Sequence, residues 1–234
     1  MIDFHSHILP NIDDGSTSVE ESIALLKMLK EQGVDTVVAT PHFTATKSNP
    51  QEFFKNRQES YEKLMAAIGE DTSLPKIKLG AEVLYYSGIS RMQQLSSFCI
   101  EGTNLLLLEM PTTKWSNSVV REVMELSCSG DITVVLAHIE RYLSKQDEWV
   151  INKLIENDVL MQVNAQFFIK RRTRRKAIKL LKNGFIQMIG SDCHGVNDRP
   201  PQISEAREIV LKKLGEDFIR YFEERNNRFM EGLS

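Results

Sequence analysis

The chain begins with MIDFHSH (residues 1–7), a short apolar run that ends in two histidines separated by one residue. In a strand, side chains at positions i and i+2 point to the same face, so this spacing presents His5 and His7 together while Ser6 faces away. Asp192 and His194 repeat the spacing after a later apolar run. Both stretches predict strands whose carboxyl ends carry metal-binding side chains.

Seven runs of this apolar kind, rich in Val, Ile and Leu, alternate with helical patterns along the chain. The strand-like runs are residues 1–4, 36–39, 76–81, 104–108, 132–137, 159–163 and 185–189. The helical patterns are residues 18–32, 51–68, 116–127, 147–157, 173–183 and 203–214, and residues 204–229 form either one helix broken near Gly215 or two. Near-continuous apolar runs are typical of strands buried on both faces.

Alternation of strands and helices favours a parallel sheet with helices outside it. Seven such units without an evident linker predict a single α/β domain over residues 1–234, a closed or nearly closed TIM-like barrel of seven strands. An open, doubly wound sheet is the alternative. The chain has neither G-x-G-x-x-G after its first strand nor G-x-x-x-x-G-K-S/T, so dinucleotide-binding and P-loop functions lack their phosphate-cradling backbone.

Composition excludes several classes of protein. The 234 residues are 41% hydrophobic, and 29 Lys and Arg against 32 Asp and Glu leave a net charge of −3, which does not suit a nucleic-acid binder. The three cysteines are in no paired spacing, which favours a reducing compartment over a disulfide framework. No apolar run approaches the roughly 20 residues that span a bilayer. We therefore expect a cytoplasmic protein without a transmembrane segment, a signal peptide or a nucleic-acid partner.

All five histidines lie at or just past the end of a strand-like run, and three carboxylates do the same. They are His5, His7, His42, His138 and His194, with Glu82, Glu109 and Asp192. One histidine at a strand end is ordinarily a structural hydrogen-bonding group. In a β/α barrel, however, these positions converge on one mouth, and five of five indicate a metal cluster. Imidazole and carboxylate without thiolate suit Mn, Fe, Zn or Co, and so many ligands imply two or three ions.

Five motifs, in this order along the chain, resemble the PHP (polymerase and histidinol phosphatase) superfamily. They are FHSHILPNIDDG (residues 4–15), TPH (40–42), GAE (80–82), AHIERY (137–142) and SDCH (191–194). More narrowly, they are similar to the CpsB/CapC-type bacterial tyrosine-protein phosphatases of capsular and exopolysaccharide synthesis. The family has a distorted barrel of seven strands, as the pattern above also predicts.

The resemblance implies three divalent metal ions. It gives the first ion His5, His7, Glu82 and Asp192, the second Glu82, Glu109 and His138, and the third Asp14, His42 and His194. Asp13, next to Asp14, is an open alternative for the third ion. Manganese is the expected metal, with iron, zinc and cobalt as alternatives. Arg141 and Arg199 correspond to arginines that bind the phosphate in this family.

The activity implied is that of a metal-dependent phosphoric monoester hydrolase, a protein-tyrosine phosphatase in which a metal-bound hydroxide attacks phosphotyrosine. The implied partner is an autophosphorylated bacterial tyrosine kinase that regulates capsular or exopolysaccharide synthesis. One alternative is a small-molecule phosphatase of the histidinol-phosphate type on the same metals. Another is a catalytically inactive, metal-stabilised interaction module.

Residues 193–199 also match C-x5-R, the loop of the cysteine-dependent tyrosine phosphatases. That chemistry needs an ionised thiol in a positive environment, whereas Asp192 precedes Cys193 and Pro200 follows Arg199. We expect Cys193 to be a small apolar filler instead.

A dense basic run, KRRTRRK, occupies residues 170–176 at the start of a helical pattern. Such a run is usually a solvated helix face. The functional alternative is a rim that attracts an acidic, phosphorylated tail or an anionic lipid.

Overall fold

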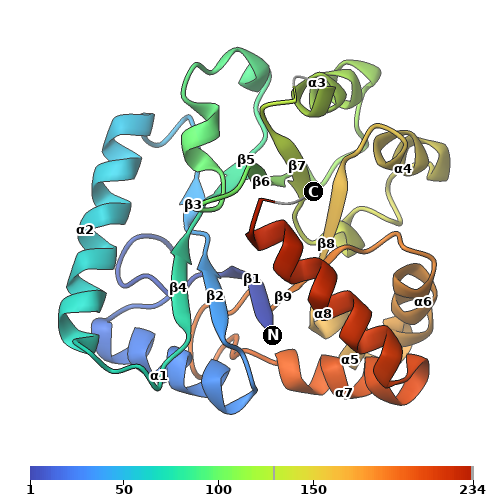
Figure 1. The fold of residues 1–234 in the computed structure, drawn as a ribbon. Coiled ribbons are helices and arrows are strands. Elements are labelled where there is room, and N and C mark those ends of the chain that lie inside the picture. The colour runs from blue at the N-terminus through green and yellow to red at the C-terminus, as the bar shows by residue number, and fades with distance from the viewer. Residues whose placement is uncertain (129, 233–234) are drawn as a thin grey trace.

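The strands of the computed structural model, which describes residues 1–128 and 130–232, run parallel and follow one another around a curled sheet (Figure 1). They are β1 (Ile2–Ser6), β2 (Thr36–Ala39), β3 (His42–Phe43), β4 (Lys76–Leu79), β5 (Glu82–Leu84), β6 (Leu105–Glu109), β7 (Thr133–Leu136), β8 (Leu160–Asn164) and β9 (Met188–Gly190). The α-helices are α1 (Val19–Glu31), α2 (Pro50–Ile68), α3 (Asn117–Cys128), α4 (Glu148–Ile155), α5 (Gln166–Ile169), α6 (Arg171–Lys182), α7 (Ile203–Leu214) and α8 (Glu216–Met230).

The sheet curls into the distorted barrel that the sequence predicts. One ladder joins β1, β2 and β4, and a second joins β3, β5, β6, β7, β8 and β9. The last strand returns to the first, because a parallel bridge pairs Ser6 with Cys193 and buried Asp3 accepts hydrogen bonds from the amide and hydroxyl of Ser191 (2.8 and 2.6 Å). Only glycine fits at Gly190 in this seam, since a Cβ there would lie 2.5 Å from the Cβ of His5.

Two predicted strands extend further than expected. The ladder of β2 and β4 is interrupted at Thr40–Pro41, where proline offers no amide donor, and it resumes as β3 beside β5. Hydrogen bonds from Gly80 to the carbonyl of Ala39 (2.8 Å) and from Glu82 to that of Pro41 (3.1 Å) carry the pairing across the break. The two interrupted strands thus deliver His42 and Glu82 to the carboxyl end of the barrel.

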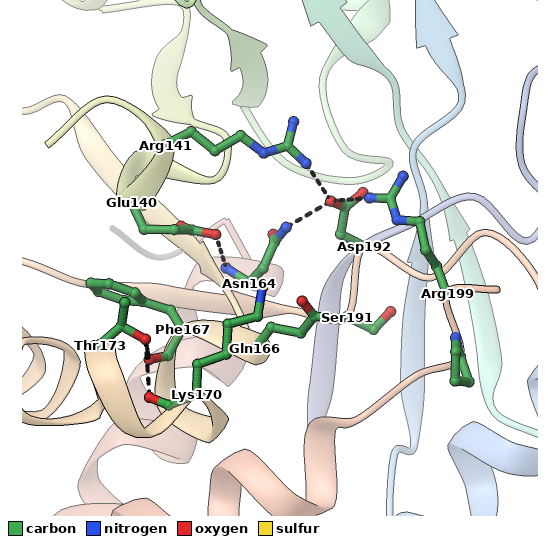
Figure 2. A pocket seen from close by; sticks show the side chains of 11 residues that line it. Glu140, Arg141, Asn164, Gln166, Phe167, Lys170, Thr173, Ser191, Asp192 and Arg199 are labelled. Carbon is green, nitrogen blue, oxygen red and sulfur yellow. Dashed lines mark hydrogen bonds and ion pairs between the residues drawn. The ribbon is translucent and has the colours of Figure 1, made fainter. Parts of the chain in front are cut away.

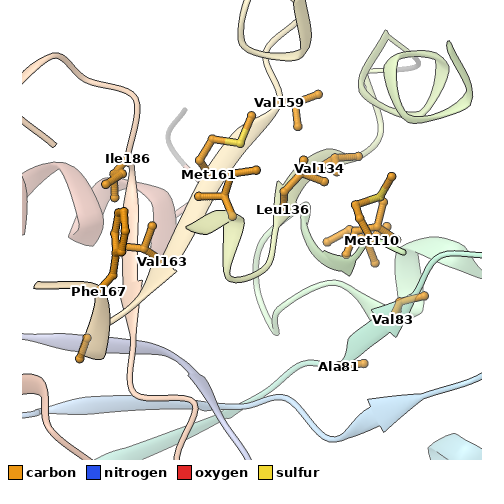
Figure 3. Packing of buried hydrophobic residues seen from close by; sticks show 14 of the residues in the cluster. Ala81, Val83, Met110, Val134, Leu136, Val159, Met161, Val163, Phe167 and Ile186 are labelled. Carbon is orange, nitrogen blue, oxygen red and sulfur yellow. The ribbon is translucent and has the colours of Figure 1, made fainter. Parts of the chain in front are cut away.

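Alternate residues of each strand enter two separate cores. Leu105 and Leu107 of β6 point into the barrel, whereas Leu106 and Leu108 pack under the outer helices. Figure 3 shows part of the outer core, where Val134 and Leu136 of β7 lie beside Met161 of β8. Burial on both faces explains why the strands appear in the sequence as continuous apolar runs.

The helices cover the outside of the barrel, and α8 lies across one end of it (Figure 1). Met230 joins the inner core, and its carbonyl accepts a hydrogen bond from Nζ of Lys78 in β4 (3.2 Å). Because α8 closes the amino end, the carboxyl end remains open to ligands. The break at Gly215 separates α7 from α8, so the last helical stretch is two helices. In the described part of the chain, no helix is both long and apolar enough to cross a membrane.

The first turn of α1 carries a modified capping box. The Ser18 side chain accepts from the Glu21 amide (3.2 Å), as expected of an N-cap. The Glu21 carboxylate reaches back to the amide of Thr17 (2.9 Å) rather than to that of Ser18, and it also accepts from the Val196 amide (3.3 Å). The start of α1 is thereby tied to the loop after His194.

Candidate metal centre

The structure gathers all nine sequence-predicted metal ligands at the carboxyl end of the barrel. Eight lie at, or just past, the end of a strand, and Asp14 lies in the loop between β1 and α1; the nine are His5, His7, Asp14, His42, Glu82, Glu109, His138, Asp192 and His194. The side chains approach one another so closely that three subsets have donor atoms within 4.8 Å of one another. These subsets are His7, Asp14, His42 and His194; His5, His7 and Asp192; and His42, Glu82 and Glu109.

The four members of the proposed first group, His5, His7, Glu82 and Asp192, are all buried. Nε2 of His5 lies 3.2 Å from Oε2 of Glu82 and 3.6 Å from Oδ1 of Asp192. Nε2 of His7 lies 3.4 and 3.5 Å from the same two oxygens. The predicted first ligand group therefore converges on one point.

Glu82 connects this group to the other two. Its Oε1 lies 2.7 Å from Nε2 of His138, which in turn lies 3.5 Å from Oε1 of Glu109. Its Oε2 lies 3.0 Å from Nδ1 of His42. A carboxylate with one oxygen toward each neighbouring group is the arrangement that a bridging ligand requires.

The geometry of the third group bears on the choice between Asp13 and Asp14. Oδ1 of Asp14 lies 3.3 Å from Nε2 of His42 and 3.6 Å from Nε2 of His194, and the side chain is exposed. Asp13 is engaged elsewhere, since it accepts hydrogen bonds from Nδ1 of His7 (2.7 Å) and from the amide of His42 (3.0 Å). The geometry favours Asp14 as the ligand and gives Asp13 the part of holding two histidines in place.

Hydrogen bonds at Nδ1 orient three of the imidazole rings toward the centre of the ligand cluster. The Nδ1–H of His7 donates to Asp13, that of His5 to Oε1 of Gln162 (3.3 Å), and that of His194 to the carbonyl of Asp192 (2.9 Å). Each Nε2 then presents its lone pair to the cluster. Nε2 of His194 is buried and has no hydrogen-bond partner. Such an orphaned acceptor, in a donor set without thiolate, fits a divalent first-row metal ion.

The sequence interpretation missed the polar residues of β8 that support these ligands. Gln162 also accepts from the His138 amide (2.7 Å) and donates to Oδ1 of Asn164 (3.2 Å), which donates to Oδ2 of Asp192 (2.6 Å). A signal was present, because Gln162 and Asn164 are polar residues at i and i+2 in an otherwise apolar strand. That spacing turns both toward the barrel interior, below the ligands.

The charged groups of the candidate metal centre shift one another's pKa values strongly. Burial opposes ionisation of Asp192, but His5, His7 and Arg199 outweigh it and hold its pKa well below the usual range. Burial likewise opposes ionisation of Glu82, whose pKa His5 and His138 keep well below its ordinary value. Burial, together with the charges of His7 and Arg199, lowers the pKa of His194 to about 4. Ionised carboxylates and a neutral His194 are the protonation states that metal ligands need. Burial opposes the charged form of His5 and His7, but neighbouring carboxylates outweigh it and raise the pKa of both, so metal binding would release their protons.

Arg141 and Arg199 lie over the cluster, and the two guanidinium groups reach Asp192 from opposite sides (Figure 2). Their Nη2 atoms lie 2.8 and 2.5 Å from Oδ2 of Asp192. They remain 40% and 36% exposed, and both line a cavity of about 360 Å³ beside the ligands. The predicted phosphate-binding arginines thus stand between the cluster and solvent, with donors still free for an incoming anion.

The structure contradicts a mechanism in which Cys193 is the nucleophile. Cys193 is completely buried, and burial raises the pKa of its thiol to about 12. Its backbone pairs with β1 in the barrel seam, so the thiol belongs to the core. A nucleophilic cysteine would need an accessible thiol with a lowered pKa.

We expect Cys193→Ala to leave the activity of the protein unchanged, because the thiol only fills space. The measurement is steady-state hydrolysis of a phosphotyrosine peptide, with iodoacetamide labelling of the folded wild type as the control. Loss of turnover in the variant, or rapid alkylation of Cys193 with loss of activity, would return the mechanism to the C-x5-R loop.

Asp13→Asn tests whether Asp13 positions His7. An amide cannot accept from Nδ1 of His7 and the two backbone amides as a carboxylate does, so metal affinity should fall by about 10- to 100-fold. The measurement is the Mn²⁺ concentration for half-maximal activity, together with the metal content of the protein. Asp131→Asn, an exposed change of the same kind, is the control. An unaltered Mn²⁺ dependence in Asp13→Asn would show that the ligand cage does not need this carboxylate.

A parallel barrel with clustered histidines and carboxylates at its mouth is the arrangement that the resemblance to the PHP superfamily implies. The model of one family, described as "Capsular polysaccharide synthesis, CpsB/CapC", matches residues 1–230, and the chain belongs to that family.

Named relatives and solved structures agree with this membership. Tyrosine-protein phosphatase CpsB of Streptococcus pneumoniae is 28% identical over 226 residues, which cover 92% of this chain and 91% of the relative. Tyrosine-protein phosphatase YwqE of Bacillus subtilis is 25% identical over 224 residues, covering 93% and 86%. A crystal structure from a study of YwqE and CpsB, described there as metal-dependent tyrosine phosphatases, matches with a TM-score of 0.85 at 22% identity over 99% of this chain and 95% of that one.

A more distant likeness places the fold among phosphatases of small molecules as well. Histidinol phosphate phosphatase of Lactococcus lactis matches with a TM-score of 0.55 at 13% identity, covering 92% of this chain and 94% of that one. At this identity the likeness concerns the fold alone.

Proposed function

We propose that this chain is a metal-dependent protein-tyrosine phosphatase, with the whole of residues 1–234 as one catalytic domain. The observation that carries the proposal is the convergence of nine metal-type ligands beneath two half-exposed arginines. The names of the relatives CpsB and YwqE support the same activity. We assign the first ion to His5, His7, Glu82 and Asp192, the second to Glu82, Glu109 and His138, and the third to Asp14, His42 and His194.

Bound divalent ions, with manganese proposed first, would supply a water of lowered pKa as the nucleophile and positive charge for the phosphoryl oxygens. The protein's own residues orient the substrate. The unused donors of Arg141 and Arg199 face the cavity and bind the phosphate, so that its phosphorus lies over the cluster. A tyrosine phenol, with a pKa of about 10, departs with less protonation than an alkyl alcohol would need.

The exposure of the mouth favours a phosphorylated protein over a small phosphate ester. Asp14 is 68% exposed and both arginines stand open to solvent, so a side chain carried on a large surface can approach. The family description supports a partner in capsular polysaccharide synthesis, and we propose an autophosphorylated bacterial tyrosine kinase in that role. The three cysteines, all free, suit the cytoplasm as the place where the two meet.

The test is hydrolysis of a phosphotyrosine peptide by protein treated with chelator and then supplied with Mn²⁺. Activity should disappear on chelation and return with metal. Histidinol phosphate, offered at the same concentration, distinguishes the small-molecule alternative, since its preferential hydrolysis would contradict the proposal. Failure to hydrolyse either ester at full metal occupancy would favour the inactive interaction module.

A further inference from the structure

The outward face of α6 carries a concentration of positive charge. Residues 170–182 contain eight Lys and Arg and no Asp or Glu. Subtracting these eight leaves the rest of the chain with 21 basic and 32 acidic residues, a net charge of −11. Seven of the eight are exposed, and we call the six that precede Lys182 the α6 basic face, namely Lys170, Arg171, Arg172, Arg175, Lys176 and Lys179.

The α6 basic face is not used to hold the fold together. Within residues 1–128 and 130–232, none of its side chains has an ion pair or hydrogen bond. The helix is held by other groups, since Arg174 donates to the carbonyls of Phe168 (3.0 Å) and Ile169 (2.7 Å), and Ala177 and Leu181 are buried in the core. The basic residues are therefore presented on a fixed support.

The charges of the α6 basic face also destabilise helix α6. Arg171 and Arg175 are like charges at i and i+4, and the first-turn cations oppose the helix dipole. Ala177 and Leu181 of α6 are buried in the core, and the exposed residues of the α6 basic face are all charged, so a membrane would attract this face by charge. A binding role explains a feature that folding alone would disfavour.

The face continues directly into the phosphate cavity. Lys170 and Thr173 line the same 360 Å³ space as Arg141, Asp192 and Arg199. Figure 2 shows Lys170 and Thr173 at the side of this cavity that lies away from Arg199. A peptide with its phosphotyrosine at the two arginines can therefore leave the cavity along α6.

We propose that the α6 basic face binds acidic residues that flank the phosphotyrosine of the protein substrate. This inference rests on the proposed function and names the chemistry of its substrate. At 1.5 Å per residue, the face from Lys170 to Lys179 spans about 14 Å, which an extended peptide covers with about four residues. The structure thus predicts a preference for Asp or Glu at roughly four positions on one side of the phosphotyrosine.

A binding measurement tests this without any turnover. Two labelled peptides carry a phosphonodifluoromethyl group in place of the tyrosine phosphate, one with four Asp or Glu on one side of the modified tyrosine and one with neutral residues there. Mn²⁺-loaded protein should bind the acidic peptide about tenfold more tightly by fluorescence anisotropy, because exposed ion pairs contribute about 0.2–1 kcal/mol each. This preference should shrink as salt rises from 50 to 500 mM.

A charge-reversal variant assigns the preference to α6. Arg171→Glu/Arg172→Glu/Arg175→Glu should abolish the preference and leave hydrolysis of 4-nitrophenyl phosphate unchanged. Acidic residues in the first turn suit the helix dipole, so the variant is expected to fold. The matched control, Lys212→Glu/Lys213→Glu/Arg228→Glu, makes the same charge change on exposed positions of α7 and α8 and should keep the preference.

Equal affinity for the two peptides, or the same loss in the control variant, would overturn the proposal. Binding of phosphatidylserine vesicles that depends on α6, without any peptide preference, would assign the face to a membrane instead. Failure of the proposed function gives a different result: phosphotyrosine peptides are not hydrolysed, while the acidic analogue still binds in a manner that depends on α6.

Discussion

Asp192→Ala is expected to abolish phosphotyrosine hydrolysis. Oδ1 of this buried carboxylate faces His5 and His7, and Oδ2 accepts from Arg141, Arg199 and Asn164. One substitution therefore removes a proposed metal ligand and the anchor of both phosphate-binding arginines. The loss in kcat/KM should exceed the roughly 10- to 100-fold that removal of an outer partner of a metal ligand costs.

The experiment measures kcat/KM and metal content together. Asp192→Ala should retain fewer ions per chain after gel filtration, and raising the Mn²⁺ concentration should not restore its activity. Asp198→Ala, an exposed carboxylate in the same loop, is the matched control and should behave as wild type. Asp192→Asn, which keeps the size of the side chain, separates loss of charge from loss of packing, with thermal unfolding as the check on folding. Substantial turnover in a folded Asp192→Ala protein would remove this residue from the metal centre.

The barrel could be predicted because burial on both faces gives each strand a continuous apolar run. Each of the seven predicted runs contains or overlaps an observed strand. The second and third strands continue past their predicted ends as β3 and β5, and the sequence hid this because Pro41 and Gly80 interrupt the pattern. The short helix α5 was also missed, since four residues form barely one turn and carry no periodicity.

The convergence of the proposed ligands could be predicted because most of them follow strands, whereas the residues that support them could not. A histidine after an apolar run is visible in the sequence, and a barrel brings all such positions together. The contact of Gln162 with His5 joins residues 157 positions apart and depends on the barrel closing. The choice between Asp13 and Asp14 likewise needed the structure, because only the turn at Gly15 decides which carboxylate faces His7 and which faces His42 and His194.

The largest expected effect outside the ligands belongs to the two arginines. Each places an Nη2 on Oδ2 of Asp192, and Nη1 of Arg141 lies 3.2 Å from Nε2 of His138 and 3.6 Å from Oε1 of Glu109, while both side chains line the cavity. Removing one preorganised donor to a developing oxyanion costs about 10²- to 10³-fold in rate. Arg199→Ala and Arg141→Ala should each fall in that range, with a greater loss in the double variant.

Two features distinguish phosphate binding from a structural role for these arginines. Inorganic phosphate should become a weaker inhibitor of both single variants, and peptide and 4-nitrophenyl phosphate substrates should be affected equally, because the arginines contact only the phosphate. Arg199→Lys should restore part of the activity, since it keeps the charge but loses the planar, bidentate geometry of the guanidinium. Arg220→Ala on α8, at the closed end of the barrel, is the control for loss of an exposed arginine. Unchanged phosphate inhibition in Arg199→Ala would place this arginine outside the substrate site and leave its bond to Asp192 as its whole function.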